Sequence, residues 1–109
     1  MGTPAVGDVV LIAFPYSDLS NRKLRPGLVV GVAERDEPIV CQITSRPYSS
    51  NGAIQILEAD FVDGSLDRVS YARPDKLFTA SPRIIQRRLG SLSTLKTAAV
   101  RKIVAALFA

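Results

Sequence analysis

Short apolar runs separated by polar turns fill most of the chain. The runs are rich in β-branched residues and are bounded by glycine, proline and aspartate, a combination typical of β-strands. The pattern over Arg83–Arg88 is compatible with a strand or with a turn of helix. The sequence predicts strands or strand pieces over Asp8–Phe14, Gly27–Ala33, Ile39–Thr44, Ala53–Leu57, Val69–Ala72 and Lys76–Thr79.

The first predicted strand is apolar on both faces. A strand of this kind is buried on both sides, or it is shared between a core and a subunit interface. The side chains of the two faces alternate along the chain. One face consists of Val9, Leu11 and Ala13, and the other consists of Val10, Ile12 and Phe14.

The C-terminal segment has the pattern of a helix. Gly90 interrupts the preceding apolar run, and Ser91 or Ser93 can cap the N-terminus of a helix. The helix is predicted over Thr94–Phe108. Apolar side chains recur every fourth residue and are predicted to form the face that covers the sheet. These residues are Leu95, Ala99, Ile103 and Leu107.

Several short strands followed by one helix predict a mainly β fold with helical decoration. The expected architecture is a small, strongly bent antiparallel β-barrel with a C-terminal α-helix. The 109 residues suit a single domain over residues 1–109, and neither a linker nor an internal repeat interrupts them.

A polar, basic connector over Pro15–Leu24 is the most informative interruption of the apolar framework. Connectors of this length inside compact domains are often functional. It leads to Arg25, whose backbone is held extended by the following proline, Pro26. We therefore expect the Arg25 guanidinium to lie at the mouth of the second strand.

Composition and charge narrow the possible partners. The net charge of +4 favours a nucleic acid, an acidic protein or an anionic surface, although a charge of this size also serves solubility alone. The single cysteine excludes an internal disulfide and fits a reducing compartment, so a cytoplasmic location is expected. No segment has the length of a membrane span, and no membrane partner is expected.

Missing residue types exclude several kinds of chemistry. The chain has no histidine, one cysteine and no glycine-rich phosphate loop. Histidine-based catalysis and cysteine-cluster zinc sites are therefore excluded, and neither a metal nor a cofactor is expected. An enzyme built on this chain would use arginine, lysine, carboxylate, hydroxyl or backbone groups.

Three polar clusters carry such groups. Cationic side chains beside hydroxyls suit a phosphodiester, and RNA supplies its own 2′-OH as nucleophile. Taken one at a time, the clusters are equally compatible with surface cations, a strand end and an exposed ion pair. The clusters are Arg22, Lys23 and Arg25; Thr44, Ser45 and Arg46; and Tyr71, Arg73 and Asp75.

The order of four segments resembles the MazF/PemK family of toxin–antitoxin ribonucleases. The segments are GDVVLIAFPYSD, KLRPGLVV, QITS and SYARPDKLFTASPRIIQRRLGSLS. The resemblance implies an SH3-like barrel, a homodimer, and metal-independent cleavage of single-stranded RNA at short sequence motifs. The implied products are 2′,3′-cyclic phosphate and 5′-OH ends. The implied partner is an antitoxin whose acidic C-terminal segment covers the RNA groove.

The same resemblance assigns roles to individual residues. It implies that Arg25 is the main catalytic arginine, that Thr44 is the catalytic hydroxyl with Ser45 as a substitute, and that Arg73 and Asp75 serve acid–base chemistry. Some relatives carry a histidine in the first connector that this chain lacks. The residues expected to bind RNA are Tyr16, Lys23, Ser45, Arg46 and Tyr71.

Two other functions remain open at this point. A member of the same fold without catalysis would bind the antitoxin only, or would inhibit another target such as gyrase. A general nucleic-acid-binding barrel is less favoured, because only 6% of residues are aromatic and the chain has no tryptophan for base stacking.

Overall fold

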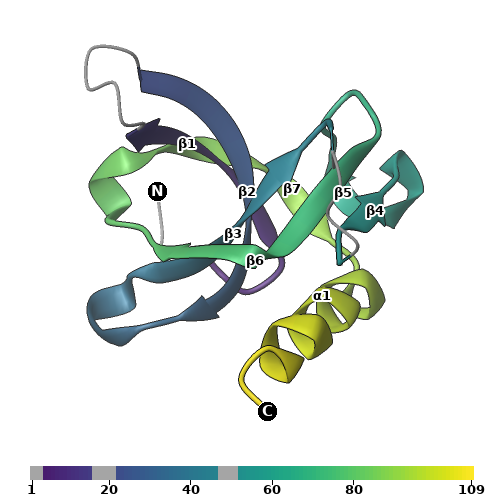
Figure 1. Ribbon diagram of the computed structural model, residues 1–109. Helices are drawn as coiled ribbons and strands as arrows, with labels where there is room; N and C mark the ends of the chain where they lie inside the picture. Colours follow the sequence, from purple (N-terminus) through teal and green to yellow (C-terminus); the bar gives the residue numbers. More distant parts are fainter. Residues whose placement is uncertain (1–3, 16–21, 47–51) are drawn as a thin grey trace.

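One curled antiparallel sheet forms the body of the protein. The computed structural model describes residues 4–15, 22–46 and 52–109. Within them, seven strands pair in the order β4-β6-β3-β2-β1-β7-β5, and the sheet bends into a half-barrel with helix α1 against one side (Figure 1). The elements are β1 (Asp8–Pro15), β2 (Arg22–Val32), β3 (Pro38–Thr44), β4 (Ile54–Ile56), β5 (Phe61–Gly64), β6 (Ser70–Thr79), β7 (Ile85–Leu92) and α1 (Thr94–Ala106). This confirms the predicted mainly β fold with a C-terminal helix.

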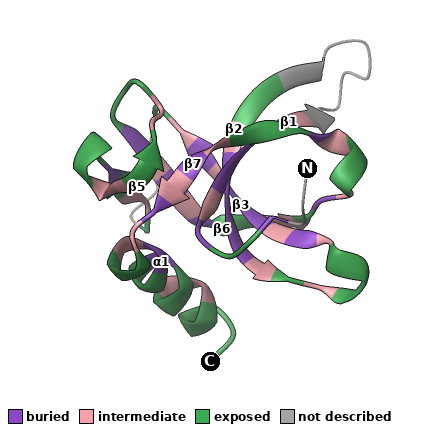
Figure 2. Cartoon of the chain, turned by 180° about the vertical axis from the view of Figure 1, so that it is seen from behind, coloured by how far each residue is buried: buried purple, intermediate pink, exposed green. Residues whose placement is uncertain are grey.

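The sheet buries side chains on both of its faces. Val9 and Leu28 belong to a cluster that also includes Val100 of α1, whereas Val10 and Val29 belong to a second cluster on the other side. The buried positions run through β2 and β3, whereas those of β7 lie towards its two ends (Figure 2). The two apolar faces predicted for the first strand are therefore both packed.

Strand β2 starts earlier than the sequence indicated. It begins at Arg22 instead of Gly27, and Arg25 pairs with Ile12 in the middle of the β1–β2 ladder. Pro26 does not obstruct the sheet, because pairing between β2 and β3 begins one residue later, at Gly27. A side chain at Gly27 would overlap a methyl group of Val40, so the glycine lets the two strands meet.

The Arg73-Pro74-Asp75 segment is a bulge inside one strand and not a break between two. The partner of Cys41 is Leu77, but the partner of the next residue, Gln42, is Arg73. Three residues of β6 therefore have no partner on β3 at this point. Bulges of this kind re-aim side chains and often lie beside functional sites.

The predicted buried face of the C-terminal helix is wrong. Leu95 is 84% exposed and Leu107 is 51% exposed, whereas Thr97 and Val100 are buried. Val104 packs on the same cluster as Val100. A repeat of four marked an apolar stripe correctly, but spacing does not tell which stripe meets the sheet.

The start of α1 agrees with the prediction. The Ser93 hydroxyl accepts a hydrogen bond from the Lys96 backbone N–H at 3.1 Å, which caps the first turn. The Lys96 ammonium donates to the Gln55 carbonyl at 3.1 Å and pairs with Asp60 at 3.4 Å. These contacts join α1 to β4 and to the turn before β5. Among the described residues, no helix has the length and apolarity needed to cross a membrane.

Arg88 of β7 forms ion pairs with a carboxylate on each of the two neighbouring strands. Arg88 contacts Asp63 of β5 at 2.9 Å and Asp8 of β1 at 3.2 Å. Two hydrogen bonds raise the pKa of the Arg88 guanidinium, chiefly the one that it donates to Asp63 and secondly the one that it donates to Asp8. The ion pair between Arg88 and Asp63 helps to hold the edge strand β5 in register with β7.

Candidate functional site

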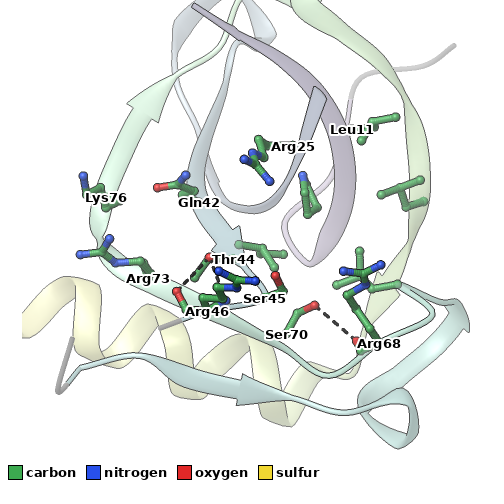
Figure 3. A pocket seen from close by; sticks show the side chains of 14 residues that line it. Leu11, Arg25, Gln42, Thr44, Ser45, Arg46, Arg68, Ser70, Arg73 and Lys76 are labelled. Carbon is green, nitrogen blue, oxygen red and sulfur yellow. Dashed lines mark hydrogen bonds between the residues drawn. The ribbon is translucent and has the colours of Figure 1, made fainter. Parts of the chain in front are cut away.

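A pocket of about 670 Å³ opens on the concave side of the sheet. Its volume lies within the range of roughly 300–1,000 Å³ usual for small-ligand sites. Side chains from β1, β2, β3, β6 and β7 and from the loops after β3 and β5 converge on it (Figure 3). The lining residues are Leu11, Arg25, Pro26, Gln42, Ile43, Thr44, Ser45, Arg46, Leu66, Arg68, Ser70, Arg73, Lys76 and Leu89.

The charge of this pocket is one-sided. Among its described lining residues, five are cationic and none is acidic. The cations are Arg25, Arg46, Arg68, Arg73 and Lys76. Neighbouring cations in a concave surface focus the field and attract a polyanion, so the pocket suits phosphate groups better than it suits a neutral ligand.

Arg25 occupies the centre of the pocket. Its position follows from β2, because the strand holds its backbone opposite Ile12 while Pro26 restricts its φ and ψ angles. The side chain reaches into the opening between the Gln42 side and the Leu11 side (Figure 3). A planar guanidinium placed there offers two parallel donors to one phosphate.

Thr44 ends β3 with a turn that its own hydroxyl closes. The hydroxyl accepts a hydrogen bond from the Arg46 N–H at 3.1 Å and donates to the Arg46 carbonyl at 3.0 Å. Both groups of Arg46 are thereby fixed, and the exposed Ser45 is held at the apex. The turn aims Ser45 and Arg46 at the pocket from the end of the strand.

The bulge in β6 brings Arg73 and Lys76 to the same wall. Arg73 donates to the Asp75 carboxylate at 3.3 Å. The Arg73 Nε atom is buried and has no hydrogen-bond partner in the described part of the chain. Asp75 itself does not line the pocket, so its contact with the site runs through Arg73.

Buried beneath this wall, Cys41 is a core residue. Its pKa is raised to about 12, chiefly by burial. A thiol with that pKa stays protonated at neutral pH and is a poor nucleophile or metal ligand. The described residues contain no group of three or more histidine, cysteine or carboxylate side chains arranged to hold a metal.

The structure brings five of the nine predicted site residues together. Arg25, Thr44, Ser45, Arg46 and Arg73 line the pocket. Asp75 joins through its ion pair, whereas Tyr71 pairs with Thr44 in the sheet and does not line the pocket. Tyr16 and the side chain of Lys23 lie outside the described residues.

Sequence reasoning missed two groups of pocket residues. Gln42, Lys76 and Leu89 stand within segments that carry the family resemblance, and the alternation of β3 puts Gln42 on the same face as Thr44. Leu66 and Arg68 carried no signal, because they come from an acidic and irregular stretch. The pairing of β7 with β1 and β5 brings Leu89 and the loop after β5 to the same pocket as Arg25.

Three solved structures with the same fold are distant from this chain in sequence. A MazE–MazF complex from Deinococcus radiodurans has a TM-score of 0.72 at 20% identity, over 99% of this chain and 97% of that chain. Mycobacterium tuberculosis toxin MazF-mt6 has a TM-score of 0.70 at 16% identity, over 93% and 95% of the two chains. A mycobacterial endoribonuclease in complex with its cognate antitoxin has a TM-score of 0.71 at 16% identity, over 99% and 95%. Among curated proteins, the search found no match.

The family comparison is more direct. The model of the PemK-like, MazF-like toxin of type II toxin–antitoxin systems matches residues 5–108, which is nearly the whole chain. The match spans every strand and the terminal helix, and the fold agrees with it. The chain therefore belongs to the PemK-like, MazF-like family of type II toxin–antitoxin toxins.

Proposed function

We propose that this toxin is an endoribonuclease that cleaves single-stranded RNA in the cytoplasm without a metal ion. The observation that carries the proposal is the meeting of Arg25, Arg73 and the Thr44 turn in one cationic pocket, whose described lining contains no acidic residue. Guanidinium and hydroxyl groups are the donors that a phosphodiester needs. Two of the similar structures are described as endoribonucleases, at 16% and 17% identity.

The proposed reaction uses the substrate as its own nucleophile. The 2′-oxygen of the RNA attacks the adjacent phosphorus, the bond from phosphorus to the 5′-oxygen breaks, and the 5′-oxygen takes up a proton. The products are a 2′,3′-cyclic phosphate and a 5′-OH. Arg25 binds the non-bridging oxygens and stabilises the extra negative charge of the phosphorane.

The remaining residues divide the other tasks. The Thr44 hydroxyl already donates its hydrogen bond to the Arg46 carbonyl. We therefore assign Thr44 the positioning of the turn and assign Ser45 the hydroxyl contact to phosphate. Arg73 neutralises charge from the β6 side. Asp75 orients Arg73 through their ion pair, and because it does not line the pocket, we assign its carboxylate the uptake of the 2′-OH proton through one water molecule.

End-group chemistry tests this function. Purified toxin is incubated with single-stranded RNA in excess EDTA, and the new ends are identified. We expect cleavage that continues in EDTA and leaves 2′,3′-cyclic phosphate and 5′-OH ends. Cleavage that EDTA abolishes, or 5′-phosphate ends, would contradict the mechanism. A folded protein that cuts no RNA would favour a toxin that acts on another target.

A protein partner for the pocket follows from the same charges. Two of the similar structures are toxin–antitoxin complexes. We propose that an antitoxin covers this pocket with an acidic segment, since carboxylates pair with the same guanidinium groups that would bind phosphate. RNA and antitoxin would then compete for Arg25 and Arg73.

A second copy of the chain is proposed to cover the outer surface of α1. Large apolar side chains are exposed at the first turn of α1, where Leu95 is 84% exposed, and just after its end, where Leu107 is 51% and Phe108 is 78% exposed. Large apolar side chains exposed together on one element favour contact with a partner. We expect light scattering at micromolar concentration to give the mass of a homodimer, and a monomer mass would contradict the proposal.

A further inference from the structure

The pocket has two chemically different ends. Arg73 and Lys76 lie on one side of Arg25, and Leu11 lies on the other side with Arg68 below it (Figure 3). Leu66 and Leu89 complete the apolar end, and both are half-buried. Leu11 comes from β1, Leu89 from β7, and Leu66 from the loop between β5 and β6.

The apolar end has no task in phosphate chemistry. A phosphate needs donors, and Arg25 in the middle of the pocket and Arg73 on the side opposite Leu11 supply them. The volume of about 670 Å³ also exceeds what one phosphate fills. A surface of leucine side chains instead suits the flat, weakly hydrated face of a nucleobase, and single-stranded RNA presents its bases unstacked.

Local hydrogen bonds hold the backbone around Arg68, although its side chain is exposed. Its carbonyl accepts a hydrogen bond from the Ser70 hydroxyl at 3.3 Å, and the preceding Asp67 N–H donates to the Ser65 hydroxyl at 2.9 Å. These contacts fix the backbone on both sides of it. None of the ion pairs among the described residues uses Arg68.

Acidic side chains disfavour a phosphate just beyond Arg68. A smaller adjoining pocket of about 330 Å³ shares Leu66 and Arg68 with the main one. It is also lined by Glu58 and Asp67. Two carboxylates repel a phosphodiester there, so the RNA backbone is expected to turn towards Arg25 and to leave a base at the Arg68 end.

We propose that Leu11, Leu66 and Leu89 form the subsite for one unstacked nucleobase and that Arg68 sets its preference for guanine. This inference rests on the proposed function, because it assigns a sequence preference to the same RNA site. The Arg68 guanidinium only donates hydrogen bonds, so it favours a base edge with two acceptors. Guanine offers O6 and N7 in that arrangement, whereas cytosine offers an amino donor at the equivalent edge.

Binding of uncleavable RNA tests the subsite without relying on catalysis. Fluorescein-labelled 2′-O-methyl pentamers AANAA, with each of the four bases at N, are titrated with toxin and followed by anisotropy. We expect the G pentamer to bind roughly 5-fold or more tighter than the C pentamer, as one good bidentate base contact implies. In Arg68→Ala, the ratio of the two affinities is expected to fall below about 2.

Two variants keep the outcome unambiguous. Arg83→Ala removes an exposed arginine that does not line the pocket, and it is expected to keep the G preference. Leu66→Ala removes apolar contact area from the subsite. It is expected to weaken the binding of all four pentamers, and that of the G pentamer the most. Unfolding temperatures of the three variants confirm that each is folded.

The possible results separate this inference from the proposed function. Equal binding of all four bases by the wild type, or a G preference that survives in Arg68→Ala, would overturn the subsite. A uniform loss across all four bases in Arg68→Ala would also overturn it, because that is the behaviour of a phosphate contact. A G preference without cleavage of ordinary RNA would leave the subsite standing and refute the ribonuclease.

Discussion

Replacement of Arg25 by alanine is expected to lower kcat/KM for RNA cleavage by about 10²–10³-fold, the usual effect of removing one donor to a developing oxyanion. Arg25 lines the pocket, and its backbone is held by pairing with β1 and by the following Pro26. The loss is expected mainly in kcat, because the contact strengthens as charge builds on the phosphorane. Single-turnover cleavage of a labelled RNA measures it.

Two further variants define what Arg25 supplies. Arg25→Lys keeps the charge but loses the planar fork, and it is expected to recover only part of the rate. Arg83→Ala removes one positive charge outside the pocket and is expected to stay within about 3-fold of the wild type, as a remote surface cation should. A loss of less than about 10-fold in Arg25→Ala would exclude a direct contact with the reacting phosphate.

Substitution of Gly64 by alanine is expected to cost about 2–5 kcal/mol of unfolding free energy, from backbone strain and from overpacking together. Gly64 has φ +75°, in the left-handed region, and its Cβ would overlap the Leu89 carbonyl. Gly90 faces it across the β5–β7 pair, so no flexible side chain can move aside. For a chain of this size, the loss lowers Tm by more than about 10 °C.

Gly52 provides the matched control for this prediction. A Cβ at Gly52 would meet nothing within 4 Å, and its φ angle is not positive. Gly52→Ala is therefore expected to be neutral, or to stabilise by up to about 1 kcal/mol through the unfolded state. Urea denaturation of both variants compares them, and equal stability would refute the close approach of β5 and β7.

The strands of the core could be predicted because their cause is local. β1 and β3 appear within one residue of the predicted bounds, since alternation and β-branching are properties of consecutive residues. The Ser93 cap was visible for the same reason. The start of β2 was not, because residues 22–26 include three cations and a proline and become a strand only by pairing with β1.

The candidate site could be predicted only in part. Arg25, Thr44, Ser45, Arg46 and Arg73 came from three polar clusters along the chain, and the fold brings all five to one pocket. Tyr71 pairs with Thr44 in the β3–β6 ladder and does not line the pocket, and a linear pattern does not reveal that pairing.

By itself, the sequence determined the mainly β class, the two-sided core strands, the capped helix and the cationic balance that suits a polyanion. These depend on periodicity, composition and local hydrogen bonding. Tertiary structure alone decided which helix face is buried, that a bulge follows Arg73 in β6, and that Leu66, Arg68 and Leu89 line the same pocket as Arg25. Each of those features depends on strand pairing between segments that are distant along the chain, and no local pattern encodes that pairing.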